Sequence, residues 1–205
     1  MSGNAFALAH WRRSVATLYA RVREPVPDRR AQCETFRRSR DDLFRTHTES
    51  PIAAHLRSDW PGVNWFAYDP AARVDALIEP AAERETFEIA LADDGVLRCA
   101  RVGVAHFVLA GRRARLALYW LEGYGGGLWL PFADATTGTV TYGGGRYLYD
   151  TIKGADLGVN ATSILLDFNY AYHPSCAYDP RWLCPLAPPG NRLPVAVRAG
   201  ERMPA

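Results

Sequence analysis

The chain has 205 residues, of which 48% are hydrophobic and 22% charged, and its formal net charge at pH 7 is +2. This length suits one domain with a real core, and the composition excludes a disordered chain. The small net charge argues against nucleic acid as a partner. We read no run of about twenty apolar residues and no signal-peptide pattern at the start, so we expect a cytoplasmic protein with no membrane partner.

The first 47 residues predict two helices. Apolar residues recur at steps of four, three and four along one face of the first helix, at Trp11, Val15, Leu18 and Val22. Pro25 and Pro27 interrupt this pattern, and Asp28 is a suitable N-cap for a second helix over residues 29–45. The arginines of this second helix are expected on a solvated face, at Arg37, Arg38 and Arg40.

From Val63 onward the pattern changes to short strands separated by turn formers, over residues 63–69, 73–79, 85–91, 101–111, 114–121, 127–132, 141–149, 163–170 and 194–200. Asp93–Gly95 is a hairpin turn signal. Sequential strands joined by tight turns pair antiparallel. We therefore predict an α+β, mainly β fold in a single domain, residues 1–205. Its N-terminal helix pair (1–47) packs on a curved antiparallel sheet or small β-barrel within residues 63–205.

The stretch "TYGGGRYLY", residues 141–149, is a first candidate site. Three consecutive glycines weaken a strand and mark a bulge or a close backbone approach. The planar guanidinium of Arg146 suits a carboxylate or phosphate, and neighbouring glycine amides would supply further donors to an anion. The alternative is a structural ion pair between Arg146 and a carboxylate such as Asp134, Asp150 or Asp167.

The Pro- and aromatic-rich segment "FNYAYHPSCAYDPRWLCP", residues 168–185, is the second candidate. His173, Cys176 and Cys184 are of the types that bind zinc, but the cysteine spacing is wider than a zinc knuckle and a fourth ligand is missing, so we predict no metal. Packed thiols or a redox-active pair remain open for the two cysteines. The other two, Cys33 and Cys99, are expected in the core.

Other catalytic templates find little support. His106 alternates with valines, which is typical of a core histidine, and no GxSxG nucleophile elbow is present. The glycine-rich stretches lack the lysine and serine or threonine of a Walker loop and the context of a dinucleotide fingerprint. A carboxylate pair such as Asp167 and Glu201 remains open, because pairing depends on the fold.

Two long segments, "PFADATTGTVTYGGGRYL" and "LDFNYAYHPSCAYDPRWLCPLAPPGNRLPVAVRAGER", resemble the bacterial family known as domain of unknown function 1684. The resemblance is specific in the C-terminal third and reaches over most of the chain. It implies that the Pro- and aromatic-rich segment is a family feature, and it implies no activity. The sequence departs from the family pattern at His173, where asparagine is expected, and at the segment 150–163, which is longer than usual and forms a lid or a longer loop.

Three functions follow as hypotheses, and the sequence names no cofactor and leaves both catalysis and the oligomeric state open. The first is a domain that binds a small anionic or polar ligand, anchored by Arg146, at a pocket formed by Tyr142, Gly144, Arg146, Tyr147, Asn169, Tyr172 and Asn191. The second is an interaction or scaffold module without pocket chemistry. The third is an enzyme that uses Cys176 and Cys184 in thiol redox or nucleophilic chemistry.

Overall fold

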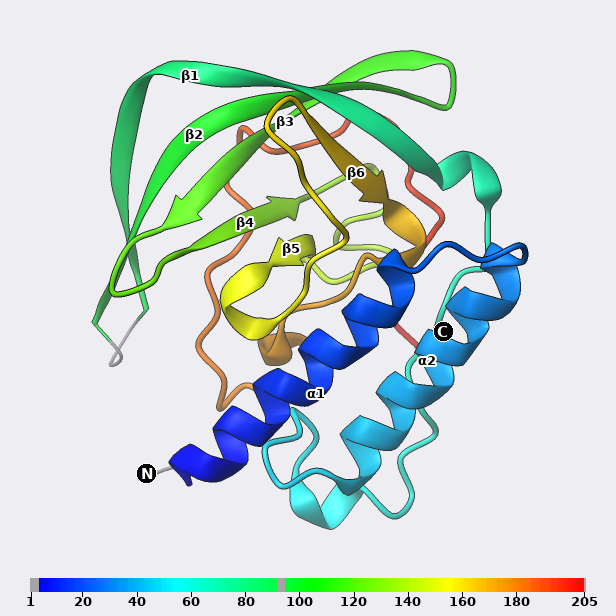
Figure 1. Ribbon diagram of the computed structural model, residues 1–205. Coiled ribbons are helices and arrows are strands. Elements are labelled where there is room, and N and C mark those ends of the chain that lie inside the picture. Colours follow the sequence, from blue (N-terminus) through cyan, green and yellow to red (C-terminus); the bar gives the residue numbers. More distant parts are fainter. Residues whose placement is uncertain (1–3, 92–94, 205) are drawn as a thin grey trace.

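The computed structural model describes residues 4–91 and 95–204, and it begins with two helices that pack side by side, α1 (Ala5–Arg23) and α2 (Arg29–Thr46) (Figure 1). The side chain of Asn4 caps α1 by accepting from the amides of Phe6 and Ala7. Asp28 caps α2 by accepting from the amide of Ala31 at 3.0 Å, as predicted. The prolines between the helices set the corner at which the chain reverses.

Six strands form one curled antiparallel sheet in the order β5-β4-β3-β2-β1-β6. The strands are β1 (Arg73–Ala90), β2 (Val96–Leu109), β3 (Arg112–Leu121), β4 (Gly127–Phe132), β5 (Arg146–Asp150) and β6 (Ser163–Asp167). The helices lie against the concave side of this sheet (Figure 1). The expected α+β, mainly β architecture is therefore confirmed.

The core fills the space between the helices and the concave side of the sheet. Aromatic rings connect the two layers: Phe36 of α2 meets Tyr19 of α1 at 5.2 Å and Tyr170 at 4.9 Å, both edge to face. A second cluster surrounds the fully buried Trp129 of β4, whose ring lies 5.6 Å from those of Tyr119 and Tyr147. This second cluster supports the part of the sheet that carries the site described below.

Several strand predictions need correction. Residues 73–79 and 85–91 were expected as separate strands, but they belong to β1, whose pairing with β2 shifts between Pro80 and Glu85. Residues 63–69 and 194–200 form no named strand, since Trp65 makes one isolated bridge to Glu201 and Phe66 donates to the carbonyl of Gly200. The predicted hairpin turn at 93–95 is not tested, because residues 93 and 94 lie outside the described residues.

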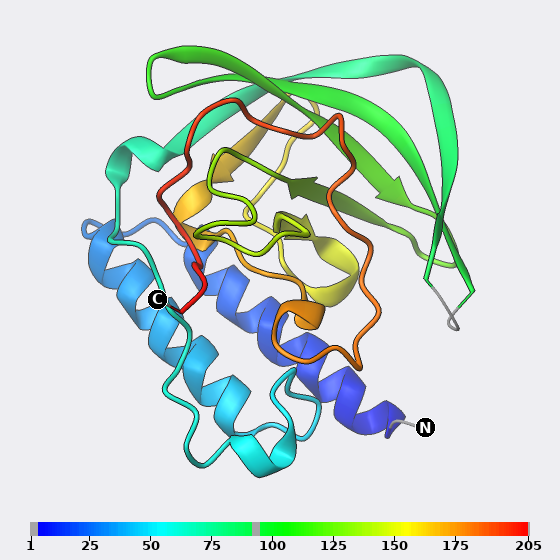
Figure 2. The same ribbon diagram turned by 180° about the vertical axis from the view of Figure 1, so that it is seen from behind.

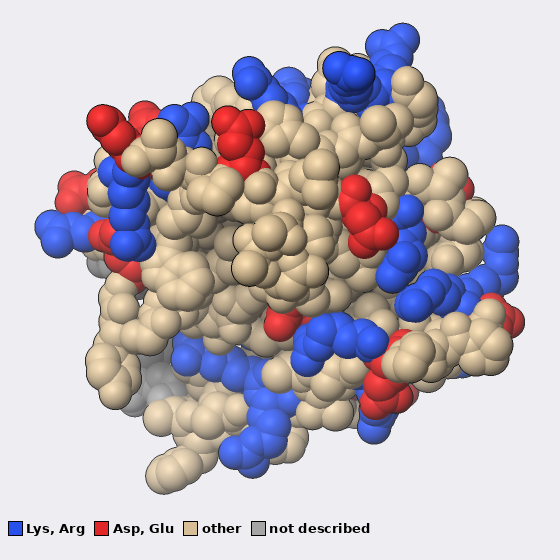
Figure 3. Space-filling view, turned by 45° about the horizontal axis from the view of Figure 1, so that its top comes forward, with Lys and Arg blue, Asp and Glu red and all other residues tan. Residues whose placement is uncertain are grey.

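The outward surface of the sheet carries charges of both signs, which are interspersed in Figure 3. Cross-strand ion pairs include Arg98 with Glu88 at 3.0 Å and Arg84 with Glu122 at 3.5 Å. His106 belongs to this surface and bonds Glu79 at 2.8 Å, so the expectation of a core histidine was wrong: the inward face of β2 is the alternate one. Within the described ranges, the helices are too short or too polar to cross a membrane.

Candidate functional site

The guanidinium of Arg146 sits at the start of β5 and is fully buried, with 0% of the residue exposed. It pairs with the carboxylate of Asp134 at 2.8 Å and donates to the backbone carbonyls of three residues near the C-terminal end, Val197, Ala199 and Glu201. Both terminal nitrogens of Arg146 are thus bound to protein oxygens. This is the structural ion pair that the sequence offered as the alternative to an anion site. Burial lowers the pKa of Arg146, and Asp134 opposes this shift by stabilising the charge.

Two of the three glycines before Arg146, Gly144 and Gly145, allow a close approach by the chain segment 174–191, which we call the strap. A side chain at Gly144 would place its Cβ 2.6 Å from Leu186, and one at Gly145 would stand 2.6 Å from the carbonyl oxygen of Phe132. The backbone of Gly145 also has a positive φ of 85°. The carbonyl of Gly144 accepts from the amide of Ala187 at 3.1 Å, so the glycines fix the strap against the sheet.

The two predicted asparagines hold backbone together. Asn191 is fully buried, and its amide group exchanges hydrogen bonds with both backbone groups of Ala117 in β3 at 2.7 and 3.0 Å. Asn169 does the same with Asp69 at 2.9 and 2.8 Å. Each side-chain amide thus bonds the backbone N–H and C=O of one residue, as the backbone of a neighbouring strand would do. Asn191 thereby anchors the end of the strap to the sheet.

The three predicted tyrosines lie on the same side of the molecule in different roles. Tyr147 is buried and donates its hydroxyl to the carbonyl of Pro185, while its backbone exchanges hydrogen bonds with that of Tyr172 at 2.8 and 3.1 Å. The Tyr142 hydroxyl lies 3.6 Å from the sulfur of Cys176. Tyr142 therefore contacts the beginning of the strap and Tyr147 its middle.

Glu201 is the centre of a buried polar cluster that reasoning from sequence missed. Its carboxylate accepts from Arg40 Nε at 2.7 Å, from the backbone amide of His173 at 2.6 Å and from the Tyr178 hydroxyl at 2.6 Å. Arg40 is 6% exposed, so its expected place on a solvated face was wrong. The polar composition of its helix gave no signal that this arginine faces a carboxylate 161 residues later.

His173 stays neutral within that cluster. Burial lowers its pKa to about 4, and Glu201 only partly opposes the shift. The backbone amide of Tyr142 donates to Nε2 of His173 at 3.3 Å. Nε2 is therefore the unprotonated nitrogen of the neutral ring, and the ring proton lies on Nδ1. Asp167 belongs to a different set of partners, Asn169 and Arg73, so the carboxylate pair considered with Glu201 does not share those contacts.

Cys176 and Cys184 are free thiols in partly exposed positions of the strap. The neighbouring Cys176 thiol lowers the pKa of Cys184 to about 6 against the raising effect of burial, and the backbone amides of Cys176 and Ser175 and the charge of Lys153 lower it further. The Cys184 thiol and burial both raise the pKa of Cys176. Cys184 is therefore the more acidic thiol of the two.

A groove of about 750 Å³ lies between the sheet and the strap. One side consists of residues from β1, β2 and β3, including Phe87 and Tyr119, whose rings meet edge to face at 5.6 Å. The other side consists of the strap residues Cys184 and 186–190. The orange segment of the chain, to which they belong, runs in front of the strands in Figure 2. Among the residues predicted for a site, Cys184 lines this groove, whereas Arg146 and the other six ligand candidates do not.

Sequence reasoning missed the aromatic side of the groove. Both Phe87 and Tyr119 lie in predicted strand segments, and the position of Phe87 between Thr86 and Glu88 was a usable signal. Tyr119 lies between Leu118 and Trp120, so its neighbours gave no such signal. The pattern of alternation does not tell which face of a curled sheet stays uncovered. The charged residues of the groove are Glu85, Glu88 and Arg101, and Arg101 bonds Glu85 at 3.0 Å on the exposed rim.

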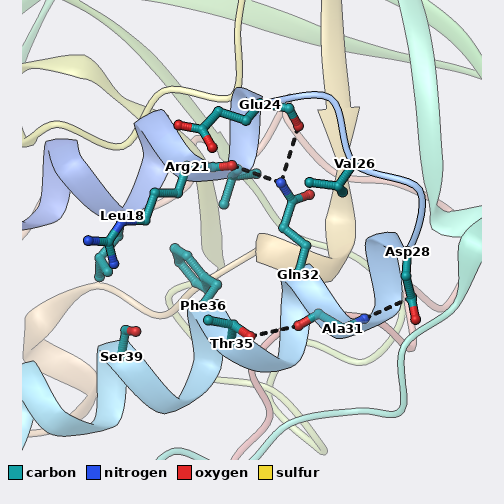
Figure 4. Close-up of a pocket in the computed structure, with 11 residues that line it drawn as sticks. Leu18, Arg21, Glu24, Val26, Asp28, Ala31, Gln32, Thr35, Phe36 and Ser39 are labelled. Carbon is teal, nitrogen blue, oxygen red and sulfur yellow. Dashed lines mark hydrogen bonds between the residues drawn. The ribbon is translucent and has the colours of Figure 1, made fainter.

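A smaller pocket of about 400 Å³ lies between α1 and α2 (Figure 4). Two of its polar side chains already have partners within the helix pair: Gln32 donates to the carbonyls of Arg21 and Glu24, and Asp28 caps α2. This pocket lies at the corner between the two helices, where the carbonyls at the end of α1 and the amide of Ala31 at the start of α2 already have hydrogen-bond partners. For metals, the described residues contain no group of three or more His, Cys, Asp or Glu side chains placed to hold an ion.

Comparisons with known proteins agree with the resemblance seen in the sequence. The model of a family described as "Protein of unknown function (DUF1684)" matches residues 58–202. The chain is also similar to a solution NMR structure of an uncharacterized protein from gene locus rrnAC0354 of Haloarcula marismortui. The two are 34% identical with a TM-score of 0.60, over 84% of this chain and 93% of that chain. No curated protein matches the chain.

The family match separates the two pockets. Every residue that lines the groove between sheet and strap lies within residues 58–202, whereas every residue that lines the pocket between α1 and α2 lies before residue 58. The matched segment also contains the glycines, Asn191 and the two thiols that fix or border the strap. The groove is therefore built from the part of the chain that defines the family.

Proposed function

The chain belongs to the family of proteins of unknown function DUF1684, and we propose that it binds a small molecule in the groove between the sheet and the strap. The observation that carries the proposal is the groove itself. Its volume of about 750 Å³ falls within the roughly 300–1,000 Å³ range of small-molecule sites. Gly144 and Asn191 hold the strap against the sheet, which supports a groove formed before a ligand arrives.

The lining suggests the chemistry of the ligand. Phe87 and Tyr119 offer aromatic surface to an apolar or aromatic body. Arg101 at the rim offers a cation to a polar or anionic end. Its bond to Glu85 joins two exposed side chains, and such pairs contribute about 0–1 kcal/mol, so a ligand displaces it at low cost. Arg146, whose partners are buried, has no comparable freedom, and the proposal therefore places the anion at Arg101.

The test uses two fluorescent probes with the same rings, 8-anilinonaphthalene-1-sulfonate and the uncharged N-phenyl-1-naphthylamine. Titration of the full chain should give saturable binding of both, with amide NMR shifts concentrated at Phe87, Tyr119 and residues 186–190. Arg101→Gln should weaken the sulfonate about tenfold, the equivalent of one charge-assisted hydrogen bond, and leave the neutral probe unchanged.

Two glycines provide a matched pair of blocking variants. A Cβ at either Gly190 or Gly143 would meet open space, and neither has a positive φ, but Gly190 lines the groove and Gly143 does not. Gly190→Trp should reduce binding of both probes at least tenfold, and Gly143→Trp should not. NMR shifts confined to residues 18–39, or equal effects of both tryptophans, would refute the groove and favour a scaffold or interaction module.

A further inference from the structure

A small cavity of about 50 Å³ lies between the two helices and the C-terminal half of the chain. Its wall includes Tyr19 of α1, Arg40 of α2, Lys153 after β5 and Ser175 at the start of the strap. None of the residues that line this cavity lines the groove between the sheet and the strap. The cavity is therefore a second, separate place at which a molecule could bind.

Arg40 has hydrogen-bond donors that no protein group uses. Its Nε donates to Glu201 at 2.7 Å, and its guanidinium lies over the rings of Phe44 and Tyr172, 4.5 and 5.1 Å from their centroids. In the part of the chain that the structure describes, the two terminal nitrogens make no hydrogen bond, and neither of them is fully enclosed by protein. Because Arg40 lines the cavity, the outer edge of its guanidinium is available to an acceptor held there.

The hydroxyl of Tyr19 is a second, independent sign of a missing partner. Tyr19 is 1% exposed, and its oxygen is buried without a hydrogen bond to any described residue. A buried hydroxyl without a partner is unfavourable, so such a group in a cavity wall indicates a bound molecule or water. Lys153, the only lysine of the chain, adds an ammonium group that pairs with Asp150 at 3.5 Å and has further donors free to bind.

We propose that this cavity binds a small carboxylate, held by the outer edge of Arg40, the hydroxyl of Tyr19 and the ammonium of Lys153. All three groups donate hydrogen bonds, and a carboxylate supplies two acceptor oxygens that match the planar fork of a guanidinium. Among the described residues, no acidic side chain lines the cavity and repels such a ligand. A volume of about 50 Å³ has room for roughly three to five groups of the size of water, which fits formate or acetate.

The balance of charges around the cavity favours a singly charged ligand. Arg40 and Lys153 are each paired with one buried carboxylate, Glu201 and Asp150, and neither of these acids lines the cavity. His173 in the wall adds no charge at pH 7, because burial lowers its pKa to about 4. A doubly charged ion such as hydrogen phosphate would bring a second buried charge without compensation, so a monocarboxylate fits better.

The test titrates the full chain with sodium acetate or with acetamide at constant ionic strength, followed by NMR of Arg40 Nε–H and of the amides of His173 and Ser175. Acetate should give saturable shifts with a Kd of about 0.1–10 mM, because so small a ligand has a limited maximal affinity. Acetamide has the same shape but carries N–H donors in place of one acceptor oxygen, so it should bind at least about tenfold more weakly. Shifts that do not saturate by about 100 mM acetate, or equal binding of acetamide, would overturn the proposal.

Three variants locate the site. Tyr19→Phe removes only the unpartnered hydroxyl, so it should weaken acetate about tenfold without lowering Tm, since no protein hydrogen bond is lost. Lys153→Gln should weaken acetate about threefold, because this lysine is half exposed. Tyr124→Phe is the matched control, since Tyr124 is exposed and does not line the cavity, and it should bind acetate as the wild type does. Unchanged binding in Tyr19→Phe, or a lower Tm of that variant, would overturn the proposal.

The same spectra separate this cavity from the groove. Acetate shifts confined to Phe87 and Tyr119 would place the carboxylate in the groove and would overturn the cavity site. Loss of fluorescent-probe binding in Gly190→Trp with intact acetate binding would leave the cavity site in place, because the two places share no lining residue. Failure of the groove therefore has a different signature from failure of the cavity.

Discussion

Removal of the Arg146 side chain tests whether this residue is a structural centre. Arg146→Ala would leave the Asp134 carboxylate, which is 1% exposed, without its cation and would remove the donors from three backbone carbonyls. Breaking a buried ion pair by removing one partner costs about 3–5 kcal/mol. In a chain of this size, this corresponds to a decrease in Tm of roughly 6–20 °C.

The assay is urea unfolding at pH 7, followed by tryptophan fluorescence and far-UV circular dichroism. Arg98→Ala is the matched control, because it removes an arginine from an exposed sheet pair with Glu88 and should cost at most about 1 kcal/mol. Arg146→Met combined with Asp134→Leu should recover part of the loss, since no charge stays buried. A loss of less than about 1 kcal/mol for Arg146→Ala, with probe binding abolished, would refute the structural role and restore Arg146 as a ligand anchor.

Two further predictions concern His173 and the glycine turn. The pKa of His173 is lowered to about 4 in the folded chain, so between pH 6.5 and 4 the unfolded chain binds a proton that the folded chain does not. Relative to His173→Asn, the wild type should therefore lose up to about 3 kcal/mol of stability as the pH falls through this window; parallel pH profiles in urea would contradict it. Gly145→Ala should lower the free energy of unfolding in urea by at least about 2 kcal/mol, because the new Cβ would stand 2.6 Å from the Phe132 carbonyl oxygen in a residue with positive φ. Gly143→Ala is the control, and a comparable loss there would show that this contact is not the cause.

Local patterns in the sequence were sufficient to predict most of the helices and strands. The steps of apolar residues in α1, the cap at Asp28 and the turn formers between strands are properties of neighbouring residues. The first two gave the two helices, and the turn formers located the sheet strands but wrongly divided β1 in two. The segments 63–69 and 194–200 were predicted as strands because their side chains suit a sheet. Whether a strand-like segment finds a ladder depends on partners elsewhere in the chain, and here only isolated backbone bonds form.

The candidate site was harder to predict because its members meet across long sequence distances. The pairing of Arg146 with Asp134 was one of the stated alternatives, since the two lie in one motif. Its bonds to the carbonyls of residues 197–201 had no side-chain signal at all. The ion pair between Arg40 and Glu201 could not be predicted either. The sequence pattern of a polar helix predicts exposed arginines, and only the fold places a carboxylate beside this one.

The contacts of Arg146 also have a consequence for how the protein is made. Its carbonyl partners are synthesised 51 to 55 residues after it. At translation rates of about 5–20 residues per second, the arginine waits roughly 3 to 11 seconds for them. During this interval the guanidinium of Arg146, in the edge strand β5, has none of these carbonyls to bind and opposes burial. The core around Arg146 therefore closes only after residues 197–201 have been made, and a ribosome that stalls between residues 146 and 197 leaves a chain that chaperones and proteases can recognise.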